Sequence, residues 1–336
     1  MTKSPFSNNK AIFFHFMKPH LLLSLLFTAM TTSFGLAQSP LKVVATVGMI
    51  GDVVKTIGGE CTDLETMMGP GVDPHLYKAT ARDVQTLNRA ELILYSGYAL
   101  EGQLGDVLER FAQRVPTLAV SETAIDEDDL IRVDDAYGVD PHLWMDVELW
   151  ANLVPALTEQ LSEVKPECAD TFAENAAAYE AELAALHAWI SEAVSTIPEE
   201  QRLMVTAHDA FSYFGRAYGL EVLGVQGIST ESEAGVADIR EVAQLIETRN
   251  VPAVFIESTI NPRTVQAVVD AVRDRGHEVT IGEQLYSDAV GESGTYGGTY
   301  LGMLYTNARN VTEGLGGSVP PLPEALSAWA NRWDLP

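Results

Sequence analysis

The chain has 336 residues, a formal net charge of −26 and only two cysteines. This acidic balance makes nucleic acid and anionic membrane surfaces poor partners, and two cysteines without a C-x-x-C spacing exclude a scaffold built on disulfides. The negative charge can concentrate cations at the surface, although solubility alone would also account for it.

The first 37 residues have the pattern of a targeting segment. Their only charges are three lysines, residues 21–27 form an apolar run, and small residues precede a cut ahead of Gln38. The pattern predicts a secretory signal peptide over residues 1–37. The alternative is an uncleaved membrane anchor, but the apolar stretch ends before the ~20 residues that a span requires. Since no cysteine follows the expected cut, we expect a soluble periplasmic protein without a stable membrane anchor.

Strand and helix patterns alternate along residues 41–165, which predicts parallel βαβ units in an N-terminal α/β lobe. Strands are expected at 41–47, 64–68, 92–95 and 117–120, and helices at 50–57, 80–87 and 147–164. The acidic segment 121–135 is expected to be a solvated loop.

A long helical pattern fills residues 166–198 between two prolines. Apolar residues recur at the i, i+3, i+4 spacing of an amphipathic helix, and nearly 30 residues would span roughly 40 Å. A segment of this length between two sets of βα units is a candidate rigid connector. An ordinary surface helix is the alternative.

The alternation resumes in residues 199–336 and predicts a second, C-terminal α/β lobe. Strands are expected at 203–206, 221–225, 253–256 and 278–281, and helices at 209–218, 234–249 and 262–275. From residue 316 the chain is expected to form a loop and a short helix.

The hexapeptide Gly-Val-Asp-Pro-His-Leu occurs twice, at residues 71–76 and 138–143. Proline restricts its own φ and favours an extended conformation of the residue before it, so each copy presents its imidazole from a stiff turn. Neutral imidazoles held in this way suit a metal site. His75 and His142 are therefore candidate ligands, and further ligands are expected elsewhere.

His208 is a third candidate, because it directly follows a predicted strand, and ligands in open α/β sheets bind beyond the carboxyl ends of the strands. A buried core histidine is the alternative. A divalent cation also favours a carboxylate, and Asp288, which follows the last strand of the C-terminal lobe, is the preferred candidate. Spacing alone leaves four competing carboxylates, namely Asp209, Glu231, Glu257 and Glu283.

Five motifs in fixed order, with the repeated turn counted once, carry a family resemblance. The two Asp-Pro-His turns are followed by Thr-Ala-His-Asp-Ala-Phe (206–211), Gln-Gly-Ile-Ser-Thr-Glu (226–231), Phe-Ile-Glu-Ser (255–258) and Leu-Tyr-Ser-Asp-Ala (285–289). From about Lys42 to Leu315 the chain resembles the zinc/manganese solute-binding proteins of ABC importers, the TroA/ZnuA-like family. The resemblance implies two lobes joined by a single backbone helix, with a metal at their interface. It also implies that His75 and His142 bind the metal from one lobe, and His208 and Asp288 from the other.

Departures from the family pattern bear on the metal. Zinc-specific members carry a histidine-rich loop where this chain has acidic residues 126–135, and many manganese-dedicated members have Glu in place of His208. Three histidines and one aspartate resemble the mixed zinc/manganese members most closely. This donor set suits tetrahedral zinc, whereas manganese prefers more oxygen, which a bidentate Asp288 would supply. We expect zinc to bind more tightly and leave the physiological cargo open.

The function that the resemblance implies is a periplasmic solute-binding protein, not an enzyme. It would capture one Zn²⁺ or Mn²⁺ per chain as a monomer and deliver it to an ABC permease in the cytoplasmic membrane. A secreted zinc metallohydrolase is an alternative, but no H-E-x-x-H occurs, and four protein ligands would leave no open position for water. The second alternative is a structural metal site in an adhesin-like surface protein. Each lobe should supply two ligands, the connector should limit motion to small rocking, and affinity should fall as pH drops through about 6.5.

Several neighbouring residues are expected to support the site. Asp73 and Asp140 should stabilise their turns, Glu257 should either orient a ligand imidazole or bind loop amides, and Tyr77 and Trp144 should shield the site from water.

For four other residues the sequence predicts no role in the site. His187 and His277 are expected at the surface. Cys61 and Cys168 could pair in an oxidising compartment, but the sequence leaves their pairing open.

Overall fold

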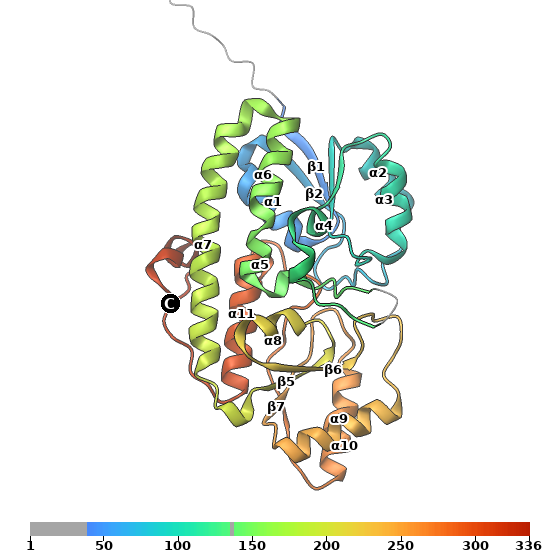
Figure 1. Cartoon of the computed structure of the whole chain (residues 1–336), viewed down its shortest axis with the longest axis vertical. Coiled ribbons are helices and arrows are strands. Elements are labelled where there is room, and N and C mark those ends of the chain that lie inside the picture. The colour runs from blue at the N-terminus through green and yellow to red at the C-terminus, as the bar shows by residue number, and fades with distance from the viewer. Residues whose placement is uncertain (1–38, 135–137) are drawn as a thin grey trace, which may run out of the picture. The chain divides into compact units, whose positions relative to one another are not determined.

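The computed structural model describes residues 39–134 and 138–336 (Figure 1), so the expected signal peptide lies outside the described residues. Residues 39–336 form one compact unit that contains two parallel sheets. Within the described ranges, no helix combines the length and the apolar character needed to cross a membrane.

The N-terminal lobe is built on a four-stranded parallel sheet. The strands are β1 (Leu41–Ala45), β2 (Thr62–Thr66), β3 (Leu92–Tyr95) and β4 (Thr117–Ala119), in the order β2-β1-β3-β4. The central strand β1 is apolar and largely buried, as expected for a sheet that helices cover on both faces. The helices are α1 (Gly48–Gly58), α2 (Ala81–Arg89), α3 (Gly105–Phe111) and α4 (Val120–Ala124).

The C-terminal lobe repeats this plan. Its strands are β5 (Leu203–His208), β6 (Glu221–Gln226), β7 (Ala253–Val254) and β8 (Thr280–Ile281), all parallel and in the order β6-β5-β7-β8. The helices are α8 (Ser212–Tyr218), α9 (Val236–Arg249), α10 (Arg263–Asp274) and α11 (Tyr300–Gly314), and the tail ends in the short helix α12 (Ser327–Arg332). The prediction of two α/β lobes with parallel sheets is confirmed.

Helix α7 (Ala169–Ser195) joins the lobes and runs alongside both of them (Figure 1). It packs against α1, α5 and α6 on the N-terminal side and against α8 and α11 on the C-terminal side. The predicted apolar stripe is the buried face, from Phe172 to Ile190. Helix α7 is therefore the predicted connector rather than an isolated surface helix.

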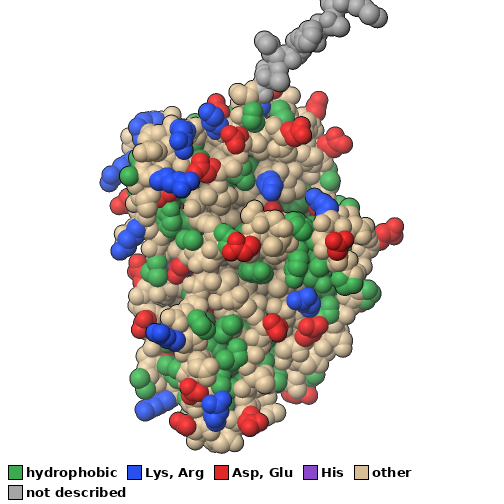
Figure 2. Space-filling view, turned by 180° about the vertical axis from the view of Figure 1, so that it is seen from behind, with side chains coloured by type: hydrophobic (Ala, Val, Ile, Leu, Met, Phe, Trp, Pro, Cys, Tyr) green, Lys and Arg blue, Asp and Glu red, His purple; other side chains and the backbone are tan. Residues whose placement is uncertain are grey.

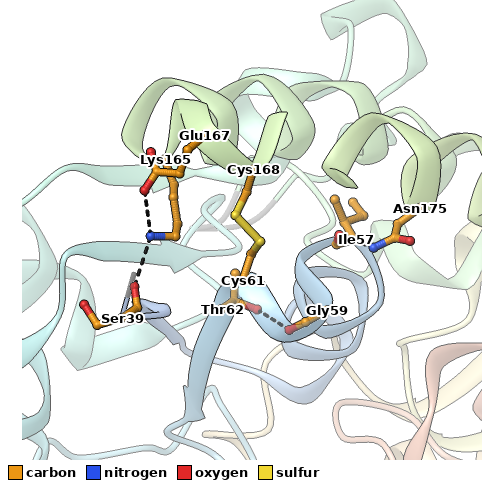
Figure 3. Close-up of a disulfide and its surroundings, with 9 residues drawn as sticks. All are labelled: Ser39, Ile57, Gly59, Cys61, Thr62, Lys165, Glu167, Cys168 and Asn175. Atoms are coloured by element: carbon orange, nitrogen blue, oxygen red, sulfur yellow. Dashed lines mark hydrogen bonds and ion pairs between the residues drawn. A yellow bond between two sulfur atoms is a disulfide. The ribbon is translucent and has the colours of Figure 1, made fainter. Parts of the chain in front are cut away.

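The two cysteines form a disulfide, Cys61–Cys168, which links the start of β2 to the N-terminal end of α7 (Figure 3). Two hydrogen bonds reinforce this junction: Lys165 Nζ donates to the carbonyl oxygen of Ser39 (3.0 Å), and Asn175 Nδ2 donates to that of Ile57 (2.9 Å). The connector is thus fastened to the N-terminal lobe at its first turns.

Some predicted elements differ from the structure. The helix expected over 147–164 is divided into α5 (Val147–Ala151) and α6 (Leu153–Val164), because Pro155 has no N–H to donate to the carbonyl of residue 151. The helix expected from residue 209 begins at Ser212. The segment 121–135 is not simply a solvated loop, since its start belongs to α4 and Ser121 is buried.

The surface in Figure 2 shows acidic and basic side chains interspersed among apolar and neutral ones. On this face the acidic residues do not gather into a patch of one sign. The net charge therefore gives no sign there of a docking surface for a basic partner.

Candidate metal centre

Four side chains from the two lobes meet at one buried point. They are His75, His142, His208 and Asp288, each at most 1 % exposed, and one ligand atom from each lies within 4.8 Å of all the others. His75 follows β2, His142 lies in the segment after β4, His208 is the last residue of β5, and Asp288 follows β8. Two of these side chains follow strands of the N-terminal sheet, one ends a strand of the C-terminal sheet and one follows its last strand.

The ligand atoms are closely spaced. Nε2 of His75 lies 3.3 Å from Nε2 of His142. The two oxygens of Asp288 lie 3.4 Å from Nε2 of His142 and 3.3 Å from Nε2 of His208. One ion could contact all four side chains after small shifts.

The two Asp-Pro-His turns are closed by their own aspartates. Oδ1 of Asp73 accepts the backbone N–H of His75, and Oδ1 of Asp140 accepts that of His142, both at 2.9 Å. This is the local bond by which Asp stabilises a turn, and it leaves both imidazoles directed at the cluster. The prediction that these aspartates stabilise their turns agrees with these contacts.

Carboxylates also hold two of the imidazoles by the ring nitrogen that faces away from the cluster. Nδ1 of His142 lies 2.7 Å from Oδ1 of Asp140, and Nδ1 of His208 lies 2.5 Å from Oε2 of Glu257. The other oxygen of Glu257 accepts the backbone N–H of His208 at 2.8 Å. These contacts agree with the first of the two alternatives for Glu257, orientation of a candidate ligand imidazole, and the amide that it also accepts belongs to the strand end at His208 rather than to a loop. With Nδ1 occupied by a carboxylate, Nε2 of His142 and of His208 is left for a metal.

Asp288 is the carboxylate that reaches the centre, and its four competitors do not. Glu257 faces Nδ1 of His208, Asp209 accepts the hydroxyl of Ser212 at 2.8 Å, and Glu231 and Glu283 are exposed.

The loop that carries Asp288 is held by helix α11. Asn307 accepts the backbone N–H of Tyr286 at 2.8 Å and donates to its carbonyl at 2.7 Å, and Asn310 donates to the carbonyl of Gln284 at 2.9 Å. Both asparagines are at most 5 % exposed. They are residues of the site's support that sequence reasoning missed, since no motif marks them.

Burial and neighbouring charges set the proton affinity of the cluster. Burial lowers the pKa of His75 to about 4. Burial acts in the same direction on His142, but the carboxylates of Asp140 and Asp288 outweigh it and raise the pKa to about 9. Burial also acts to lower the pKa of His208, but the carboxylates of Glu257 and Asp288 outweigh it and raise this pKa well above its usual value. Burial would raise the pKa of Asp288, but His208 and His142 hold it well below its usual range.

The residues present fit a divalent metal. Nε2 of His208 and both oxygens of Asp288 are buried and make no hydrogen bond within the described chain. Leaving a buried polar atom unsatisfied costs about 1–3 kcal/mol, and more for a charged group. A cation bound by three imidazoles and a carboxylate would satisfy these atoms.

The shielding residues differ from each other. Trp144 is buried, lies edge-on to His142 with ring centroids 5.3 Å apart, and donates Nε1–H to the carbonyl of Ser287. Tyr77 is half-buried, and its hydroxyl interacts with Asp83 at the start of α2. Trp144 thus packs against one imidazole of the cluster, whereas the Tyr77 side chain contacts α2.

Comparison with known proteins gives concordant matches. The family model described as "zinc-uptake complex component A periplasmic" matches residues 43–314. The "manganese-binding lipoprotein MntA" of Bacillus subtilis is 43 % identical over 279 residues, which cover 83 % of this chain and 91 % of that protein. The "zinc-binding protein TroA" of Treponema pallidum is 45 % identical over 292 residues, which cover 86 % and 94 %. A solved structure of the periplasmic zinc-binding protein TroA from Treponema pallidum superposes with a TM-score of 0.80 and 45 % identity, covering 82 % of this chain and 99 % of that one.

Proposed function

The chain belongs to the zinc-uptake component A family, and from this membership we propose that it captures Zn²⁺ or Mn²⁺ outside the cytoplasm and delivers it to an ABC permease. The supporting observation is the buried cluster of three imidazoles and one carboxylate, in which three ligand atoms have no hydrogen-bond partner among the described residues. His75, His142, His208 and Asp288 are the proposed ligands, with one metal ion per chain.

The donor set is compatible with both metals. Three nitrogens and one oxygen make a tetrahedral zinc site, in which Asp288 would bind through one oxygen. Both oxygens of Asp288 are free of hydrogen bonds within the described chain, so bidentate binding would add the oxygen that manganese favours. We propose that zinc binds more tightly and that either metal occupies the same four ligands.

The site is suited to carriage rather than catalysis. Four protein ligands close the coordination shell of a tetrahedral ion, whereas a catalytic zinc keeps one position for water. Because each lobe supplies two ligands, a small rocking of the lobes would separate the pairs and release the ion. We also propose that the protein acts as a monomer, that it delivers its metal to a permease and that a signal peptide is cleaved after residue 37. The proposed bounds are 41–165 for the N-terminal lobe, 166–198 for the connector and 199–336 for the C-terminal lobe.

Competitive loading tests the function. Metal-free protein is mixed with Zn²⁺ and Mn²⁺ together, separated from free ions and analysed for bound metal. We expect one equivalent in total, mostly zinc, and a rise in the unfolding temperature with either ion, since a thousandfold excess over Kd stabilises the folded state by about 4 kcal/mol. An unfolding temperature that neither metal changes would contradict the proposal. Metal-dependent hydrolysis of an activated ester or peptide would favour the hydrolase instead.

A further inference from the structure

The two copies of Gly-Val-Asp-Pro-His-Leu differ in their surroundings. Leu143 of the second copy is fully buried, whereas Leu76 of the first is 50 % exposed. The second turn therefore lies in the core, and the first lies at the rim of the metal centre.

The second turn is firmly attached to the C-terminal lobe. The hydroxyl of Tyr213 on α8 donates to the carbonyl of Asp140 and accepts the N–H of Ile131, both at 3.0 Å. The hydroxyl of Tyr300 on α11 donates to the carbonyl of Trp144 at 2.7 Å. Separating the lobes at this turn would break several buried hydrogen bonds together.

The first turn contacts the C-terminal lobe through a threonine. The hydroxyl of Thr230, which is 9 % exposed, donates to Oδ2 of Asp73 at 2.5 Å. Oδ1 of the same carboxylate accepts the N–H of His75. In the second turn, the matching Oδ2 of Asp140 has no hydrogen-bond partner within the described chain. The carboxylate of this aspartate thus makes a hydrogen bond between lobes in the first copy, whereas in the second copy the backbone carbonyl does so.

The loop that bears Thr230 follows the edge strand β6, beside a cavity of about 540 Å³ between that strand and α9. Gln226, Gly227, Ser232 and Glu233 are among the residues that line this cavity, and Gln226 Nε2 donates to the carbonyl of Ser232 at 3.0 Å. On the other side of the loop, the hydrogen bond from Thr230 to Asp73 ties it to the first turn.

We propose that Thr230 is a positioning residue for the metal centre. Its hydroxyl holds Asp73, and through Asp73 the backbone of His75, against the C-terminal lobe. Breaking this hydrogen bond frees the first turn while the second turn stays attached, so metal is exchanged on the His75 side. The inference rests on the proposed function and adds the residue that controls the rate of release.

Release of Zn²⁺ into an excess of a chromophoric chelator measures this role. Thr230→Val keeps the shape of the side chain and removes its hydroxyl, and we expect release to become about tenfold faster or more, the effect of losing a hydrogen bond to a charged group. Thr230→Ser keeps the hydroxyl and should release at close to the original rate. Asp73→Ala removes the acceptor of the same hydrogen bond and should accelerate release at least as much.

Two comparisons separate positioning from general loosening. Thr86 is the matched control, since its buried hydroxyl donates to Glu65 at 2.9 Å within the N-terminal lobe, so Thr86→Val should leave release unchanged. In an Asp73→Ala background, Thr230→Val should add no further acceleration.

The outcomes separate a failure of the role of Thr230 from a failure of the proposed function. Unchanged release in Thr230→Val, or equal acceleration with and without Asp73, would overturn this inference alone, provided that the unaltered protein binds zinc. Failure of the unaltered protein to bind Zn²⁺ or Mn²⁺ would overturn the proposed function and this inference with it.

Discussion

At the residue scale, the metal centre depends on which nitrogen each imidazole presents. Asp140 and Glu257 accept Nδ1–H of His142 and His208, which fixes the tautomer and makes Nε2 the better electron donor. The sequence identified the histidines by their turns and by the strand end. It could not reveal the pairing of Glu257 with His208, because that contact arises from β5 and β7 being neighbours in the sheet.

Substitution of His208 tests the ligand set. Removing a ligand should weaken zinc binding by at least about 100-fold, since changes in the outer carboxylates alone cost 10- to 100-fold. Isothermal titration of His208→Ala measures this loss. His187→Ala is the control, because that side chain lies on α7 beside Tyr218, outside the cluster. Strong weakening in the control and none in His208→Ala would show that the ligand set is wrong.

The pH dependence of metal affinity follows from the raised pKa values. A metal must displace protons from His142, whose pKa is raised to about 9, and from His208, whose pKa is also raised. Competition by protons therefore begins at higher pH than the ordinary value near 6.5, and affinity should fall as pH drops below about 9. The pKa of His75 is about 4, so it should add to the loss only in acid. Titrations in buffers of different ionisation enthalpy count the protons released, and no release at pH 7.5 would contradict this expectation.

At the element scale, prediction succeeded where one periodicity dominated and missed helix α11. The alternation of strands and helices and the apolar stripe of α7 were visible in the sequence. Helix α11 was not, because polar residues such as Asn307 and Thr312 are buried along with its apolar ones, and no polar face remains to mark a period. The support of the Asp288 loop was missed for the same reason.

Asp52 connects helices α1 and α11 and makes the free energy of unfolding depend on pH. It lies on α1 and accepts the N–H of Tyr300 at the start of α11 at 2.8 Å. Burial raises its pKa to about 6, although the Tyr300 N–H, Lys55 and Arg332 act to lower it. The folded state therefore binds this proton more tightly than the unfolded state, whose pKa is near 3.8. The contribution to stability is fully present below pH 3.8 and is lost as pH rises through 6.

Asp52→Asn should remove this dependence. The amide stays neutral and can still accept the Tyr300 N–H, so the variant should exceed the original protein in unfolding free energy by at most about 3 kcal/mol at pH 8 and should come close to it at pH 4. Urea unfolding at both pH values measures the difference. The exposed Asp106→Asn is the control. A lower stability of Asp52→Asn at pH 8 would contradict the prediction.

At the scale of the whole molecule, the connector α7 is attached to both lobes. The disulfide, Lys165 and Asn175 attach its beginning to the N-terminal lobe. Near its other end, Trp189 Nε1 donates to the carbonyl of Pro320 and the hydroxyl of Thr196 donates to that of Ser318, both at 3.0 Å. We therefore expect motion between the lobes to be limited to small rocking. The sequence left the disulfide open because the pairing depends on how β2 and α7 approach each other.

Removal of the disulfide should weaken the fold and spare the metal site. The bridge closes a loop with a sequence separation of 107, and such bridges typically stabilise by about 2–4 kcal/mol. The Cys61→Ser/Cys168→Ser variant should unfold at a lower denaturant concentration. Its zinc affinity, measured in native buffer, should stay within a few-fold of the original. An unchanged unfolding midpoint would contradict the expected stabilisation.

The two sheets have the same strand order, so positions at the ends of corresponding strands can be compared. In the C-terminal copy, the residue at the end of the first strand, His208, is held by Glu257, which follows the third strand. In the N-terminal copy, the residue after the first strand, Thr46, donates its hydroxyl to Glu101, which also follows the third strand, at 2.8 Å. A proposed ligand in one lobe thus has, in the other lobe, a counterpart outside the metal cluster. The strand order is common to the two lobes while the proposed ligand set is not, so we expect that substitutions in a single lobe can change metal preference and leave the other lobe intact.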